Sequence, residues 1–200
     1  MEEFDYADFV SEERIVPEEK LGKYNLPFIS FPVVFLFLFV INFGTAPFLS
    51  GVDEYFTLPN LFLVFTGGFL VHETLHFLCW QALTRYPIQE FRMGIRWNSF
   101  TPVIGCQRPM KLFPFRAGLI FPLLLMGVIP LGMAFWLGNT WLLFSGCLFI
   151  SWASADVLTL ILIWKSPAGS MVEMHRKGLG AILYTRKPEI VPEPEYPQPV

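Results

Sequence analysis

The chain has 200 residues, of which 54% are hydrophobic, 17% aromatic and 16% charged. With a mean hydropathy of +0.49, this composition excludes an ordinary water-soluble domain and predicts an integral membrane protein. The formal net charge of −3 averages an acidic N-terminal segment with basic segments elsewhere, and it does not indicate nucleic acid as a partner.

Residues 1–27 are acidic and polar, and we expect them to form a flexible cytoplasmic arm. A cleavable signal peptide needs a basic start followed by an apolar stretch, and this segment has neither. We therefore expect the first apolar run to act as its own insertion signal.

Four apolar runs follow, each long enough to span a hydrocarbon core of about 30 Å. They predict an all-α domain of four transmembrane helices over residues 28–164. Pro32, Pro122 and Pro130 should kink the first and third helices, which membrane helices tolerate. The runs are Phe28 to Leu49, Leu58 to Leu83, Leu112 to Leu137, and Trp141 to Trp164.

The basic residues predict the orientation of these helices. All 14 Lys and Arg residues lie before the first run, between or at the rims of the second and third, or after the fourth. The connections 50–57 and 138–140 carry only Asp53 and Glu54 as charges. The positive-inside rule then places both termini and the central connection in the cytoplasm of a multi-pass cell-membrane protein. Residues 165–200 are expected to form a cytoplasmic tail, which is Pro-rich and extended or disordered from Pro188.

The second run contains His72-Glu73-Thr74-Leu75-His76, an HExxH motif. Positions four apart on an α-helix lie about 40° apart on one face, so both imidazoles can reach a single metal ion. Glu73 flanks them where it can exchange a proton with a water at that ion. The motif predicts Zn²⁺ bound by His72 and His76, with Glu73 as catalytic acid and base.

Two interpretations without a metal remain open. The motif arises by chance on solvated faces of soluble helices, but between Leu58 and Leu83 only Cys79 is otherwise ionisable, so no solvated face is expected. The three side chains could instead form a hydrogen-bonded polar cluster. Two imidazoles and a carboxylate are costly in hydrocarbon unless they have partners, which favours the metal.

The connection between the second and third runs has the pattern of a short β-hairpin. Aromatic and β-branched residues in 91–97 and 100–106 flank the turn pair Asn98-Ser99. A free strand edge near a zinc ion could hold an extended peptide by strand addition. A simple loop at the membrane surface is the alternative, and the sequence does not separate the two.

A catalytic zinc ion usually has three protein ligands and an open position for water. Asp156 is the only acidic residue in the third or fourth run, and it lies eight residues before Trp164, while His76 lies seven before Leu83. At about 1.5 Å per residue the two side chains are nearly level in the membrane, which predicts Asp156 as the third ligand. A hydrogen-bonded structural acid is the alternative.

Three other polar residues have weaker claims to the site. Cys79 falls on roughly the same helical face as His72, but buried membrane cysteines usually pack. His175 lies beyond the fourth run, where tail packing is the first expectation and a role beside the site the second. Arg116 is expected to reach the cytoplasmic interface rather than an oxyanion. An odd number of cysteines, two of them within spans, indicates no disulfide framework.

These features together resemble the DUF3267 family, the "putative zincin peptidases", which look like reduced relatives of the site-2 intramembrane metalloproteases. The resemblance covers about Gly67 to Leu183. It implies zinc at His72 and His76, Glu73 as acid and base, and Asp156 as third ligand. The Asn-Pro and Asp-Gly motif of the site-2 proteases is absent. The residues that carry the resemblance are HETLH at 72–76, Gly94 to Trp97, Pro102, Phe121-Pro122, the small residues before Asp156, and Met171 to His175 with Gly178.

The sequence thus predicts a membrane-embedded zinc metallopeptidase that hydrolyses peptide bonds at or within the cytoplasmic half of the bilayer. Its expected partners are the lipid bilayer and a peptide or membrane-protein substrate; neither the substrate's identity nor the oligomeric state is indicated. The alternative is a non-catalytic protease-like scaffold or a metal-binding membrane protein. Glu73 favours an enzyme, because a scaffold has no need of a costly carboxylate beside two histidines.

Overall fold

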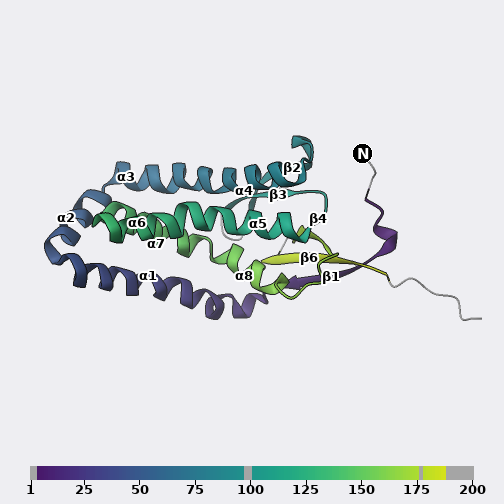
Figure 1. Ribbon diagram of the computed structural model, residues 1–200, viewed down its shortest axis with the longest axis horizontal. Coiled ribbons are helices and arrows are strands. Elements are labelled where there is room, and N and C mark those ends of the chain that lie inside the picture. Colours follow the sequence, from purple (N-terminus) through teal and green to yellow (C-terminus); the bar gives the residue numbers. More distant parts are fainter. Residues whose placement is uncertain (1–3, 97–100, 176–177, 188–200) are drawn as a thin grey trace, which may run out of the picture.

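The computed structural model describes residues 4–96, 101–175 and 178–187. Its helices lie side by side along the long axis of the molecule, and small β-sheets lie at one end of them (Figure 1). The helices are α1 Leu21–Phe43, α2 Thr45–Tyr55, α3 Leu58–Phe62, α4 Gly68–Thr84, α5 Leu112–Pro122, α6 Ile129–Leu137, α7 Thr140–Trp152 and α8 Ser154–Ile163.

Three described helical runs are long and apolar enough to cross a membrane, namely Leu21–Phe43, Leu58–Thr84 and Leu112–Leu137. In the second run α3 and α4 are joined by a π-helical segment, Leu63–Gly67, and in the third α5 and α6 are joined by another, Leu123–Val128. Such segments absorb local irregularity without ending a helix. Both runs closely match the segments expected from the sequence.

The first and fourth segments differ from that expectation. Helix α1 begins earlier, at Leu21, and ends at Phe43, because Gly44 has a φ of +89°, which L side chains rarely adopt. A separate helix, α2, then leads to α3. The fourth segment consists of α7 and α8, which meet at Ala153 with a bend of 45°. The bend puts Asp156 into the first turn of α8.

The described strands form two antiparallel sheets, so the prediction of an all-α protein was wrong in this respect. Strands β2 (Phe91–Arg96) and β3 (Thr101–Cys106) pair as the expected hairpin. The other sheet has four strands in the order β1-β6-β5-β4. Its members are β1 Phe9–Ile15, β4 Met110–Lys111, β5 Met171–Met174 and β6 Gly180–Arg186.

The four-stranded sheet joins the two ends of the chain. Strand β1 pairs with β6 from Phe9 opposite Arg186 to Ile15 opposite Gly180. The segment before α1 therefore contains a strand where a flexible arm was expected, and the segment after α8 contains two strands where a tail was expected. Strand β1 is an edge strand with mostly exposed side chains, so its polar sequence does not reveal it. The Pro-rich segment from Pro188 lies outside the described residues.

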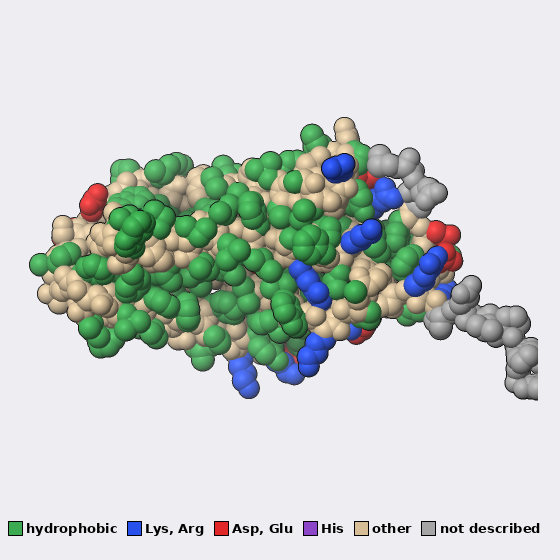
Figure 2. All heavy atoms as spheres, in the orientation of Figure 1, with side chains coloured by type: hydrophobic (Ala, Val, Ile, Leu, Met, Phe, Trp, Pro, Cys, Tyr) green, Lys and Arg blue, Asp and Glu red, His purple; other side chains and the backbone are tan. Residues whose placement is uncertain are grey.

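Charged side chains gather at the sheet end of the molecule. In the face shown in Figure 2, hydrophobic side chains cover most of the helical body, and Lys and Arg side chains lie over the part near β1, β4 and β6. The largest of the buried clusters also lies toward this end, because it packs α4 and α5 against the strands. It includes Trp80, Phe115, Leu119, Met110 and Val172.

Candidate metal site

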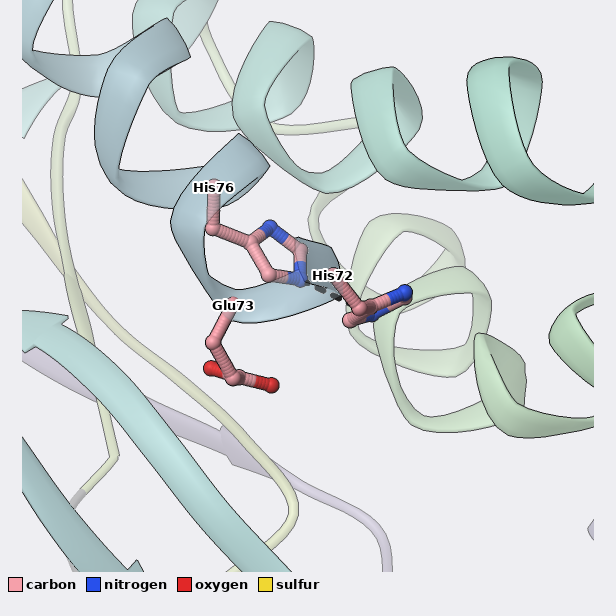
Figure 3. A group of neighbouring side chains, drawn as sticks. All are labelled: His72, Glu73 and His76. Atoms are coloured by element: carbon pink, nitrogen blue, oxygen red, sulfur yellow. Dashed lines mark hydrogen bonds between the residues drawn. The ribbon is translucent and has the colours of Figure 1, made fainter. Parts of the chain in front are cut away.

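Helix α4 supplies three of the predicted site residues. His72, Glu73 and His76 are 2%, 6% and 4% exposed, and Figure 3 shows their side chains extending to the same side of the helix, with the two imidazoles close together. Each offers a ligand atom within 4.8 Å of the others. The HExxH spacing alone produces this arrangement once the segment is helical.

Asp156 reaches the same place from α8. Its Oδ2 lies 3.2 Å from Nε2 of His72 and 3.3 Å from Nε2 of His76, and the two nitrogens are 3.2 Å apart. Four tetrahedral ligands at metal bonds of about 2.0 to 2.1 Å are separated from one another by about 3.3 Å. The three atoms therefore have the spacing of one face of a tetrahedral zinc site, and the structure brings together all four residues named from the sequence.

The hydrogen bond of His76 fixes which of its nitrogens is free. Its Nδ1 lies 2.9 Å from the backbone oxygen of Gly118 in α5. A carbonyl oxygen can only accept, so Nδ1 carries the hydrogen, and in the neutral ring the lone pair is on Nε2. That lone pair faces His72 and Asp156. Ligand atoms at this spacing could share one metal ion.

Glu73 is held from the other side by the hairpin. The backbone N–H of Ile104 in β3 donates to Oε2 of Glu73 at 2.8 Å. This bond draws the carboxylate toward β3 and leaves it beside the two imidazoles. Strand β3 therefore lies directly against the acid whose proton chemistry the motif predicts.

Two hollows meet at this point. A cavity of about 90 Å³ adjoins the histidines, and a larger groove of about 390 Å³ runs along β3 and β5. They share Val103, Ile104 and Met174. Beyond the site residues, the cavity is lined by Trp152, Ala155, Thr159, Leu179 and Gly180, and the groove by Arg92, Met93, Gly94, Gly105, Cys106, Gln107, Glu173 and His175.

The cysteines do not add to the cluster. Among the described residues the group that could hold a metal comprises the HExxH side chains and not Cys79, which is half-buried. Burial raises the pKa of the Cys106 thiol above its ordinary value, so this residue is a neutral thiol near pH 7. Cys106 lines the groove without being an activated nucleophile.

His175 and Arg116 make their contacts at the end of the helices where the sheet lies. His175 Nδ1 accepts from the N–H of Gly178 at 2.6 Å, and its Nε2 lies 3.7 Å from the carboxylate of Glu13 in β1. Arg116 donates to the carbonyls of Ile163 and Trp164 at 2.6 Å each, where α8 ends. A cation at the C-terminus of a helix is favourable, and Arg116 points there rather than into the site.

The contributions of Gly118 and Ile104 could not be read from the sequence. Both act through backbone atoms, which carry no side-chain signal. The sequence contains only two indirect clues, namely the glycine at position 118 and the hairpin pattern around position 104.

Comparison with known proteins agrees with the chemistry of this residue set. No curated protein and no solved structure matches the chain. A family model described as "DUF3267: Putative zincin peptidase" matches residues 65–171, which is more than half of the chain and includes the HExxH motif and Asp156. The similarity to site-2 proteases stays a prediction. The chain therefore belongs to the DUF3267 family, which carries the description "Putative zincin peptidase".

Proposed function

We propose that this protein is a membrane-embedded zinc metallopeptidase that cleaves peptide bonds in the cytoplasmic half of the bilayer. The observation that carries the proposal is the near-equilateral triangle of His72 Nε2, His76 Nε2 and Asp156 Oδ2, with sides of 3.2 to 3.3 Å and Glu73 beside it. Two imidazoles and a carboxylate with a free fourth position are the donor set of catalytic rather than structural zinc.

The residues divide the work of hydrolysis between them. His72, His76 and Asp156 would hold the Zn²⁺, and its Lewis acidity would polarise the scissile carbonyl and lower the pKa of a water toward about 7. Glu73 takes the proton from that water and delivers it to the leaving amine. The Ile104 N–H holds one oxygen of Glu73, so the carboxylate stays oriented during both transfers.

The free edge of β3 is suited to hold the substrate. Gln107 N–H donates to Glu90 on the β2 side at 2.8 Å, whereas Ile104 N–H points the other way, to Glu73. The backbone groups of Pro102, Ile104 and Cys106 therefore face away from β2, toward the site and the groove. Because Pro102 has no N–H and the Ile104 N–H is taken by Glu73, this edge offers mainly carbonyl acceptors. A helical peptide hides its carbonyls, so a peptide that is cleaved here must be extended, and strand addition to β3 would hold it so.

The pairing of the chain ends supports four spans. Strands β1 and β6 pair along their whole length, so the segments before α1 and after α8 lie on one side of the membrane. Three spans would separate them. The bent pair α7 and α8 therefore counts as one crossing, and the Lys and Arg residues at the sheet end make that side cytoplasmic.

Zinc content and peptide cleavage by the full-length protein in detergent test this function. The wild type should bind one equivalent of zinc and cleave extended peptides. Asp156→Ala should lose zinc affinity, while Glu73→Gln should keep the zinc and lose cleavage by about 10²- to 10⁴-fold, because only the proton acceptor is removed. Glu54→Gln, at an exposed carboxylate in α2, is the matched control and should behave as wild type.

Three results would contradict the proposal. Zinc bound by Asp156→Ala with wild-type affinity would remove the aspartate from the ligand set. Undiminished cleavage by Glu73→Gln would remove the glutamate from the mechanism. Zinc binding without any cleavage that depends on Glu73 would identify the protein as a metal-binding scaffold.

A further inference from the structure

The carbonyl that binds His76 is one that its own helix cannot use. In an α-helix the C=O of each residue accepts from the N–H four residues later. The residue four after Gly118 is Pro122, which has no N–H. The Gly118 oxygen is thereby released from the hydrogen-bond ladder of α5, and it lies 2.9 Å from Nδ1 of His76 on α4.

The close approach of α5 to α4 at this point depends on the glycine. A Cβ at position 118 would overlap the indole of Trp80, one turn after His76. The Trp80 ring stacks on the His76 imidazole at 5.3 Å and donates from Nε1 to the carbonyl of Phe115 at 3.4 Å. The Gly118 backbone thus comes within hydrogen-bond distance of the His76 ring, which already stacks against Trp80.

His72 has no corresponding support. Its Nδ1 is buried and has no hydrogen-bond partner among the residues that the structure describes. Among the described residues, a hydrogen bond at Nδ1 therefore fixes the ring of His76 but not that of His72. Partners of this kind fix the tautomer and ring angle of a metal-binding histidine, and their loss typically costs about 10- to 100-fold in metal affinity.

We infer that Pro122 is a positioning residue of the metal site. Pro122 has no N–H to donate to the Gly118 carbonyl, so this carbonyl stays available to accept from His76 Nδ1–H. That hydrogen bond keeps the Nε2 lone pair of His76 toward the zinc position. This inference rests on the proposed function for its metal, but the hydrogen bond itself joins two protein atoms. A proline that only shaped the helix would act on His76 through its ring and not through its missing N–H, and these two effects can be separated by experiment.

The test is Pro122→Ala in the full-length protein, with ¹⁵N-labelled histidine. The new N–H at position 122 competes for the Gly118 oxygen, so we expect His76 to lose part of its Nδ1–H population in the imidazole ¹⁵N spectrum of the metal-free protein. We also expect zinc affinity, measured by competition with a chelator, to fall by about 10- to 100-fold. Pro130→Ala is the matched control, because it lies 8 residues further along, roughly 12 Å away, and should change neither reading.

A second variant separates the missing N–H from the lost proline ring. Lactic acid at position 122 has the methyl group of alanine and an ester oxygen in place of the N–H. It should restore the wild-type imidazole spectrum and zinc affinity, since the Gly118 carbonyl is again left to His76. An equal loss in the ester and in Pro122→Ala would show that the ring, not the missing N–H, matters, and would overturn the inference.

The outcomes distinguish this inference from the function on which it rests. If the wild type binds zinc and Pro122→Ala has the same affinity and the same ¹⁵N spectrum, Pro122 has no positioning role and the metallopeptidase proposal is unaffected. If the wild type binds no zinc, the proposed function fails, while the metal-free spectra still report whether Pro122 controls the His76 tautomer.

Discussion

At the scale of single residues, helix α4 is fixed by positions that have no side chain. A Cβ at Gly118 would overlap Trp80, and a Cβ at Gly68, one turn before His72, would overlap the ring of Phe149 in α7. Gly118 lets α5 approach α4, and Gly68 leaves room for the Phe149 ring of α7. The side chains of the candidate site keep their positions because close-packed interiors resist even one added methyl group.

A pair of glycines in the third apolar run tests this packing. We expect Gly118→Ala to lower the free energy of unfolding by about 1 to 3 kcal/mol, because the added methyl overpacks a filled contact. Gly132→Ala is the control: nothing lies within 4 Å of its Cβ position, so stability should be unchanged or rise by up to about 1 kcal/mol. Thermal or denaturant unfolding in detergent measures both, and similar transitions for the two variants would contradict the expectation.

At the scale of helices, prolines leave backbone carbonyls free within their own helix, and side chains of neighbouring helices donate to these carbonyls. Pro32 in α1 has no N–H to offer the carbonyl of Phe28, and the hydroxyl of Ser151 in α7 lies 2.8 Å from that oxygen. Ser151 immediately precedes the bend that leads to Asp156. The same device that we infer for His76 thus also ties α1 to α7, because a freed carbonyl in an apolar interior needs a donor.

A double-mutant cycle would measure this contact between α1 and α7. Ser151→Ala should lower the free energy of unfolding by about 0.5 to 1.5 kcal/mol, because the Phe28 carbonyl loses its donor. In a Pro32→Ala background the same change should cost less, since the new N–H at position 32 bonds to Phe28 within α1. Equal costs in the two backgrounds would show that Ser151 and Pro32 are not coupled.

At the scale of the whole molecule, the sheet at one end joins segments from the start, middle and end of the chain. Strand β6 carries β1 on one edge and β5 on the other, and β5 carries β4, which directly precedes α5. Leu179 and Gly180, at the start of β6, also line the cavity beside the histidines. The sheet therefore closes the candidate metal site on the side that faces away from the helical body.

The proposed orientation can be tested with single cysteines in a background without the native ones. A cysteine at Asp53, in the acidic connection formed by α2, should react with a membrane-impermeant maleimide in intact cells. A cysteine at Glu12, in β1, should react only after the cells are lysed, because we place both chain ends in the cytoplasm. Labelling of both positions in intact cells, or of Glu12 alone, would contradict this orientation.

Local patterns in the sequence sufficed for some elements and failed for others. The runs Leu58–Thr84 and Leu112–Leu137 were predicted closely because continuous apolar length is a strong signal. Aromatic and β-branched residues around a turn pair indicated the hairpin of β2 and β3, with a simple loop as the alternative, and the two strands do pair. Strand β1 was missed because it pairs with residues more than 150 positions away in sequence and because a polar edge strand looks like a loop. Strands β5 and β6 pair locally, but the segment after the last apolar run was expected to be a tail.

The sequence by itself determined that His72, Glu73 and His76 share one face of an apolar helix, since helical spacing is a local property. It also indicated the depth of Asp156, since depth follows from counting residues along a span. Only the tertiary structure decided that Asp156 Oδ2 lies 3.2 to 3.3 Å from both imidazoles, that Gly118 holds His76, and that Ile104 holds Glu73. These contacts depend on the rotation of helices about their axes and on backbone atoms, neither of which the order of side chains specifies.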